Sequence, residues 1–244
     1  MSHLAAQKGR PHLSNLYPPE GRLLYTLQNR ANEETLYRPR QTMARETVVE
    51  GRVTLCTPAH DLVVQLGPFT GTIPREEAAL GIREGTAREI SILSRVGKPV
   101  SCVVTQVEGS LLLSRRRAQE LALAALLAYP PGTVLPATVT HLAGFGAFVD
   151  VGCGVVSMIG IENCSVSRIS HPARRFTVGQ EIYTVLTGTD RSLGRLYLSP
   201  KELLGTWQEN AARLPPGLHP GRRLHPAGTG PAPPARGGPG GPSG

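Results

Sequence analysis

The sequence predicts a β-dominated protein made of two small five-stranded barrels joined by a helix, with a helical N-terminal extension and a disordered C-terminal tail. Three observations lead to this fold class. Four segments of the 244-residue chain recur in the same order about 85 residues later. Each copy contains short β-branched runs separated by Gly, Pro, Asn or Asp. An Ala- and Leu-rich stretch lies between the copies, and such a composition favours a helix.

The first 45 residues form the N-terminal extension, which has little hydrophobic pattern. Pro18 and Pro19, followed by Glu20 and Gly21, indicate a turn. The leucines that follow this turn could line short helices. We therefore expect a helical extension over 1–45 that packs on the body of the protein.

The internal repeat sets the domain organisation. Residues 62–67 match 147–152, and 109–115 match 194–200, both at an offset of 85. Two further pairs keep the same order, 51–56 with 137–142 and 95–100 with 177–182. Four ordered matches predict two copies of one domain, at 46–118 and 133–201.

Each copy is expected to form a small barrel. In the second copy the β-branched runs cover 134–142, 147–151, 155–161, 181–186 and 195–198. Five short strands in about 70 residues suit a closed barrel better than a sandwich, which needs more strands. The stretch 163–175 is expected to be an irregular or short helical crossover.

A helix should follow each copy. The helix-forming run at 116–129 is stopped by Pro130 and Pro131, which makes 119–132 the linker helix. After the second copy, residues 202–213 carry Leu203, Leu204 and Trp207 at helical spacing. Residues 214–244 hold 9 Pro and 9 Gly and predict a disordered tail. That tail is either a natural extension or a frame-changed remnant of a third repeat.

Composition excludes several classes of protein. The net charge is +8, but the excess lies at the two ends, with +3 in 1–48 and +3 in 214–244. The four cysteines lack a Cys-x-x-Cys pair, which argues against a zinc site or a disulfide scaffold. No apolar run is long enough for a bilayer or a secretory signal. We expect a cytoplasmic, non-catalytic protein without a metal or cofactor.

Two aromatic residues are the first candidates for a binding site. Phe145 and Phe148 are expected in one strand, and exposed aromatics on a barrel bind unpaired bases by stacking. Three residues apart in a strand, they should face opposite sides unless a bulge intervenes, and Gly146 allows one. Burial of one or both in the core is the alternative. The Gly144-x-Gly146 pattern lacks the third glycine of a dinucleotide site.

Basic residues near these aromatics in sequence are the second set of candidates. Guanidinium groups pair with phosphates and stack on bases. A solvated loop is the alternative for each of them. The triplet Arg115, Arg116 and Arg117 either contacts a nucleic-acid backbone or only solvates a helix. The basic candidates are Arg168, His171, Arg174, Arg175 and Arg195.

Four segments of the second copy resemble a known family. Residues 131–140, 145–152, 176–180 and 194–199 together look like the RNA-binding repeat of ribosomal protein S1. The resemblance covers 133–201 well and 47–117 more weakly. It implies OB-type five-stranded barrels that bind single-stranded RNA without catalysis or cofactor.

The resemblance also implies which residues bind. The two family aromatics match Phe145 and Phe148. Tyr197 stands where a basic residue is common and could stack, whereas Gly160 replaces a frequent histidine. In the first copy the aromatic positions become His60 and Val63, so that repeat is expected to be degenerate.

Two functions follow from these residues. The first is binding of single-stranded RNA, in particular mRNA, by stacking and Arg–phosphate contacts in translation. The small ribosomal subunit is a further candidate partner, and no membrane partner is expected. The alternative is a ribosome- or nuclease-associated adaptor whose barrels contact proteins.

Overall fold

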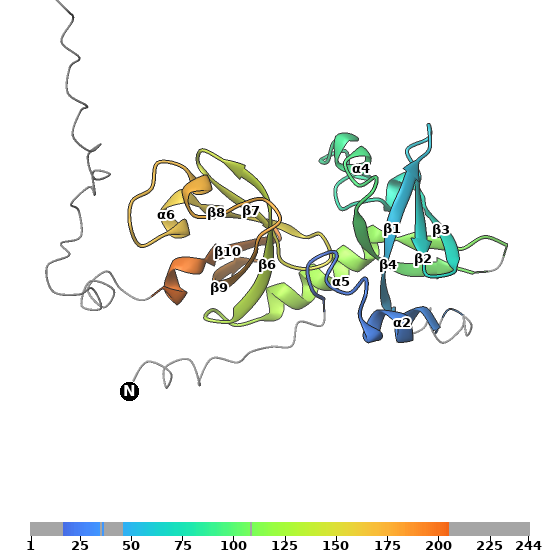
Figure 1. Cartoon of the computed structure of the whole chain (residues 1–244), viewed down its shortest axis with the longest axis horizontal. Helices are drawn as coiled ribbons and strands as arrows, with labels where there is room; N and C mark the ends of the chain where they lie inside the picture. Colours follow the sequence, from blue (N-terminus) through green and yellow to red (C-terminus); the bar gives the residue numbers. More distant parts are fainter. Residues whose placement is uncertain (1–16, 35, 37–45, 108, 205–244) are drawn as a thin grey trace, which may run out of the picture. The chain divides into compact units, whose positions relative to one another are not determined.

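Two five-stranded barrels with the same strand order make up most of the protein (Figure 1). The computed structural model describes residues 17–34, 36, 46–107 and 109–204. The predicted fold class, two barrels with a helix between them, is confirmed. The predicted disordered tail and most of the predicted helix at 202–213 lie outside the described residues. No described helix combines the length and hydropathy needed to span a bilayer.

The first barrel closes through its own strands. Its order is β1-β2-β3-β5-β4, and the parallel pair Thr72–Leu112 of β3 and β5 completes the ring. Alternating buried side chains on β2, such as Leu62, Val64 and Leu66, fill the core. The strands are β1 Val48–Cys56, β2 Leu62–Leu66, β3 Phe69–Ile73, β4 Pro99–Gln106 and β5 Leu112–Ser114.

The second barrel repeats this order as β6-β7-β8 with β10-β9 on the other side of β6. β8 and β10 stand at the two ends of the order, and Ser157 Oγ of β8 donates to Leu196 O of β10 at 2.9 Å. The same order in both copies is that of an OB barrel. The strands are β6 Val134–Ala143, β7 Gly146–Asp150, β8 Val156–Gly160, β9 Glu181–Asp190 and β10 Arg195–Ser199.

Short helices fill the connections between the strands. The N-terminal extension contains the two-turn helix α2, whose buried Asn29 exchanges hydrogen bonds with the backbone of Glu50. The predicted crossover in the second barrel is the short helix α6 followed by a 3₁₀ turn η3. The helices outside the linker are α2 Leu27–Glu34, η2 Arg75–Glu77, α4 Ile90–Leu93, α6 Ile161–Cys164, η3 Pro172–Arg174 and η4 Pro200–Leu203.

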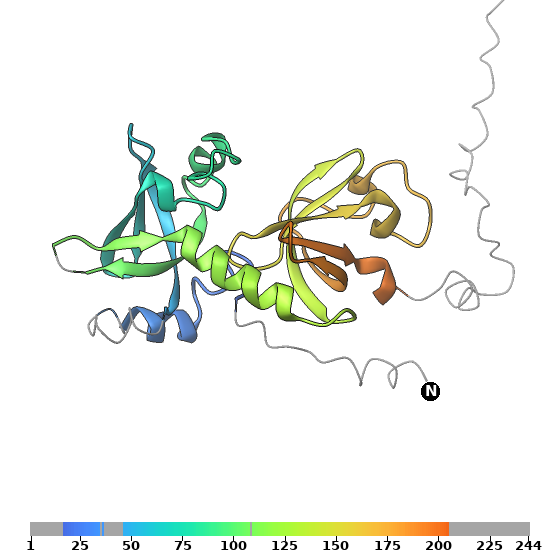
Figure 2. The ribbon, with the colours of Figure 1, turned by 180° about the vertical axis from the view of Figure 1, so that it is seen from behind.

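Helix α5, Arg115–Ala128, connects the end of β5 to β6 (Figure 2). Ser114 caps it, because its hydroxyl accepts from Arg117 N at 2.8 Å. Ala118, Ala122 and Leu126 of α5 are buried in the core of the second barrel. The helix therefore belongs to the packing of the second barrel while its first turn remains attached to the first.

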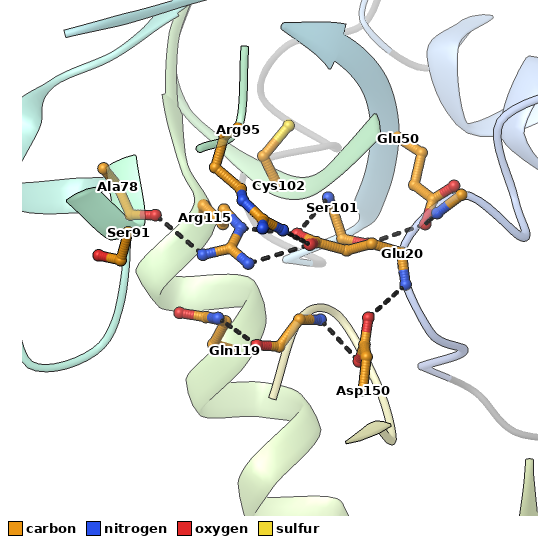
Figure 3. Close-up of polar contacts among 12 residues, drawn as sticks. Glu20, Glu50, Ala78, Ser91, Arg95, Ser101, Cys102, Arg115, Gln119 and Asp150 are labelled. Atoms are coloured by element: carbon orange, nitrogen blue, oxygen red, sulfur yellow. Dashed lines mark hydrogen bonds and ion pairs between the residues drawn. The ribbon is translucent and has the colours of Figure 1, made fainter. Parts of the chain in front are cut away.

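A buried ion pair joins the N-terminal extension to that first turn (Figure 3). Arg115 Nε donates to Glu20 Oε1 at 2.6 Å and Arg115 Nη2 donates to Glu20 Oε2 at 3.0 Å. Both side chains are only 6% exposed. Arg115 Nη1 also donates to Ala78 O of the first barrel, and Ser101 N of β4 donates to Glu20 Oε1. The pair thus fixes the extension, the helix and the first barrel together.

Asp150 attaches the second barrel to the same cluster. Its Oδ2 accepts from Glu20 N at 2.8 Å, and its Oδ1 accepts from Gly152 N and Gly154 N at 2.9 and 3.0 Å. Gly154 has a φ of +79°, and a Cβ there would meet the Arg115 guanidinium. Gln119 Nε2 donates to Gly154 O, so α5 secures the other side of this turn.

Glu20→Gln should destabilise the whole protein. The substitution leaves the buried Arg115 guanidinium without its counter-charge, which costs about 3–5 kcal/mol of unfolding free energy. Urea unfolding measures the loss. The matched control is Glu181→Gln, because Glu181 is 68% exposed and pairs with Arg22 at 3.4 Å; it should cost less than about 1 kcal/mol. Equal effects of the two substitutions would contradict the anchoring role of Glu20.

Asp150 should make stability depend on pH. Burial, and then the charge of Glu20, raise the pKa of Asp150 from 3.8 to about 7. The folded state therefore holds this proton more tightly than the unfolded chain, and the contribution of Asp150 to stability falls as pH rises through that window. Urea unfolding at two pH values near the ends of the window should show a smaller decline in Asp150→Asn. An identical decline in both proteins would refute this assignment.

Candidate nucleic-acid interface

Three rings lie together on the outside of the second barrel. Phe145 and Phe148 meet edge to face, with ring centroids 6.0 Å apart and planes at 85°. The His141 ring lies 5.8 Å from the Phe148 ring. Phe145 is 62% exposed, His141 is exposed and Phe148 is half-buried. We call these three residues the ring cluster.

The β6–β7 hairpin positions the ring cluster. Gly144 and Phe145 form the turn between the two strands, so Phe145 and Phe148 do not share a strand as the sequence analysis expected. The irregularity in register lies in β6, between Val139 and His141, and it places His141 opposite Phe148. The bulge that Gly146 would allow does not form, because Gly146–Asp150 pair regularly with β8. Gly146 instead allows close packing, because a Cβ there would lie 2.5 Å from Ile159 O.

Beside Phe148 the surface is hollowed between β8 and β10. The hollow has a volume of about 490 Å³. Met158, which pairs with Phe148 across the β7–β8 ladder, lies on its wall and is 46% exposed. Arg195 and Tyr197 of β10 line it too, and Tyr197 is 53% exposed. We call this the β8–β10 hollow.

Four of the eight candidate residues from the sequence thus come together: Phe145 and Phe148 in the ring cluster, and Arg195 and Tyr197 in the hollow beside Phe148. The other four are on the crossover. Arg168 lines a separate depression with Ile161, Glu162 and residues 165–170. Arg174 and Arg175 are exposed at η3. His171 caps η3, because its Nδ1 accepts from Ala173 N at 3.1 Å.

Sequence reasoning missed His141 and Met158. Each belongs to a run that was assigned only as a strand, and neither is part of an aromatic motif. The strand register supplies the missing information, because both residues stand opposite Phe148. A cross-strand pairing scheme for the expected hairpin could have found them.

The cationic groups of the second barrel are available for a ligand. Among the described residues, none of its exposed arginines lies within ion-pair distance of a carboxylate. Exposed guanidinium groups of this kind bind anions. These arginines are Arg168, Arg174, Arg175, Arg191 and Arg195.

In the first barrel, the equivalent surface has a different chemistry. Across the β1–β2 and β2–β3 ladders, Leu55 pairs with Val63 and Val63 pairs with Thr72. These three residues hold the places of His141, Phe148 and Met158. His60 replaces Phe145, and its Nδ1 lies 3.1 Å from Glu89 Oε2. The first barrel therefore has no stack of exposed rings at this face of the described structure.

Carboxylates also neutralise two arginines of the first barrel. Arg75 pairs with Glu89, and Arg83 pairs with Glu77. The arginine triplet at the start of α5 also forms ion pairs with carboxylates. Arg115 binds Glu20, Arg116 binds Glu77 and Glu120, and Arg117 binds Glu46 and Glu120. The triplet is thus a structural hub of ion pairs.

The second barrel combines flat exposed rings with unpaired cations. Rings of this kind stack on planar groups, and guanidinium groups pair with phosphates. Single-stranded nucleic acid carries both features. The described ranges contain no group of three or more His, Cys, Asp or Glu arranged to hold a metal ion.

Comparison with known proteins places the second barrel in a family. Residues 129–201 match the model of the S1 RNA binding domain. The chain is 30% identical over 166 residues to small ribosomal subunit protein bS1 of Leuconostoc lactis, covering 64% of the chain and 37% of that protein. It is 32% identical over 130 residues to the bS1 homolog of Bacillus subtilis, covering 50% and 34%. The chain thus spans about a third of the length of these relatives.

Among solved structures, the chain is similar to one in the crystal structure of the a/eIF2alpha-aDim2p-rRNA complex from Pyrococcus horikoshii. The identity is 23% and the TM-score 0.30, over 34% of this chain and 51% of that chain.

Proposed function

The chain is an S1-family protein, and from this we propose that its second barrel binds single-stranded RNA, mRNA in particular, in the service of translation. The family match to residues 129–201 supports RNA binding. Two relatives that share sequence with it are named as small ribosomal subunit proteins. In this proposal the small subunit is a further partner.

The observation that carries the proposal is the ring cluster beside the β8–β10 hollow. Phe145 offers an exposed ring to a base, and its edge-to-face contact with Phe148 supports it. Met158 and Tyr197 extend the apolar floor, and Arg195 supplies a cation in the same hollow. Stacking tolerates any base, whereas phosphate pairing gives salt dependence. The arrangement therefore suits a single strand without demanding one sequence.

The crossover residues have a secondary place in this proposal. Arg168, Arg174 and Arg175 lie outside the hollow and would contact the backbone of a bound strand by charge alone. His171 has a structural bond to Ala173 N and would add little. The loss of any one of these arginines should weaken binding of all sequences alike.

Fluorescence anisotropy of a labelled oligouridine strand, measured across a salt series with the full chain, tests the proposal. Each phosphate contact should contribute about −0.7 to the slope of log affinity against log salt. Phe145→Ala should lose roughly 1–3 kcal/mol of binding free energy without changing that slope. The matched control is Tyr25→Ala, which removes an aromatic side chain that is 78% exposed elsewhere in the chain.

The thermal stability of each variant must be measured together with its RNA affinity. Phe148 is half-buried, and truncation of a buried Phe costs about 3–5 kcal/mol of stability, so thermal melting accompanies every titration. Normal melting with normal RNA affinity in both Phe145→Ala and Phe148→Ala would refute stacking. Absence of RNA binding at low salt would refute the RNA function and favour an adaptor that contacts proteins.

The second barrel should contribute ring contacts to RNA affinity that the first barrel does not. His141 and Leu55 occupy equivalent places, opposite Phe148 and Val63 respectively. His141→Ala should cost about 1 kcal/mol of RNA binding because it removes a ring from the cluster. Leu55→Ala should leave the affinity unchanged. An equal loss in both variants, measured on the same oligonucleotide, would show that both barrels present an RNA face.

A further inference from the structure

A second hollow adjoins the β8–β10 hollow. It has a volume of about 490 Å³, and the two share Val155, Val156 and Gly194 on their walls. His141 of the ring cluster lines it from the second barrel. Ser91, Ser94 and Arg95 line it from the first barrel. We call this the inter-barrel hollow.

The inter-barrel hollow lies where the buried ion pairs hold the two barrels. Glu20, Arg115 and Asp150 line its base. The pair Arg115–Glu20 is internally neutral, and three backbone N–H groups already bind the Asp150 carboxylate. Each of these groups therefore already has its hydrogen-bond partners and needs none from a ligand.

Arg95 is the side chain in this hollow whose hydrogen-bond donors are not all paired. Its Nε is buried without a hydrogen-bond partner among the described residues. Its Nη1 reaches Glu20 Oε2 only at 3.4 Å, and its Nη2 reaches Ser94 Oγ at 3.4 Å. Glu20 is already bound more closely by Arg115. A buried donor without a partner is costly, and an anion in the hollow would supply the missing acceptor.

We propose that a single RNA strand bound on the ring cluster continues into the inter-barrel hollow, where Arg95 pairs with a phosphate against the Ser91–Ser94 wall. The inference rests on the proposed function and extends it to the first barrel. That barrel has lost its own ring cluster, but it forms the opposite wall of the site on its neighbour. The binding site therefore spans both copies of the repeat.

Because the two hollows share wall residues, the proposal predicts that affinity depends on strand length. Single OB folds bind about 4 to 16 nucleotides, so a strand of about four nucleotides covers one small stacking site, whereas one of about twenty nucleotides extends beyond a single OB face. The full chain should bind the longer strand at least about tenfold more tightly than the shorter one. The increase comes from contacts in the inter-barrel hollow.

Ser91→Glu tests the hollow without touching the ion pairs at its base. The Ser91 hydroxyl donates only to Arg88 O in its own turn, so a glutamate there adds a negative charge to the wall and should repel phosphate. Affinity for the long strand should fall about tenfold, whereas affinity for the short strand should change less than about twofold. Ser110→Glu, the same change at an exposed serine of the β4–β5 hairpin, is the matched control.

A second measurement does not depend on affinity. A long strand carrying 4-thiouridine at either end should photo-crosslink to the segment around Ser91 and Arg95, and the crosslink should vanish in Ser91→Glu. Thermal melting of both glutamate variants verifies that the barrels remain folded.

The outcomes separate this inference from the proposed function. Equal affinity of Ser91→Glu and Ser110→Glu for the long strand, with no crosslink to the first barrel, would overturn the inter-barrel path while short-strand binding persists. Failure of the unchanged protein to bind either strand would instead overturn RNA binding itself.

Discussion

The ion pair between Arg115 and Glu20 is the constraint on which the rest of the structure depends. A guanidinium buried at the first turn of α5 requires a counter-charge and further acceptors, because an unpaired buried charge is severely destabilising. Glu20 supplies the charge and Ala78 O the further acceptor. To do so, the N-terminal segment must cross between the barrels, where Glu20 N also reaches Asp150. The extension is therefore a structural part of the repeat pair.

The duplication shows how one fold can serve two purposes. Both barrels have the same strand order, so their core positions are under the same packing requirement. Their outer faces are not under this packing requirement and can differ. Where the second barrel has His141 and Phe148, the first has Leu55 and Val63. The first barrel also pairs Arg75 and Arg83 of its own surface with carboxylates.

The strands and the linker helix could be predicted from local pattern, because β-branched runs and an Ala-Leu helix carry their own periodicity. Phe145 and Phe148 could be proposed from residue type, but their meeting depends on a hairpin turn and on an irregularity in β6 that no residue marks. The ion pairs of the Arg115–Arg117 triplet could not be predicted from the sequence, because the partners Glu20, Glu46 and Glu77 are far away in sequence. The crossover arginines were grouped with the two phenylalanines because they lie near them in sequence. In the fold, these arginines lie outside the β8–β10 hollow.

Strand β7 links the junction to the binding face. Phe148 and Asp150 stand two residues apart, so alternation directs both side chains to the same side of the strand. Asp150 is held by Glu20 N and by the glycine turn at 152–154, whereas Phe148 supports the open ring of Phe145. The same hydrogen bonds that seat the N-terminal segment therefore fix the end of the strand that carries Phe148 of the ring cluster. Because the fixed end faces the first barrel, the position of the rings and the width of the inter-barrel hollow are set by one group of contacts. A site that extends over both barrels is the consequence of that shared anchor.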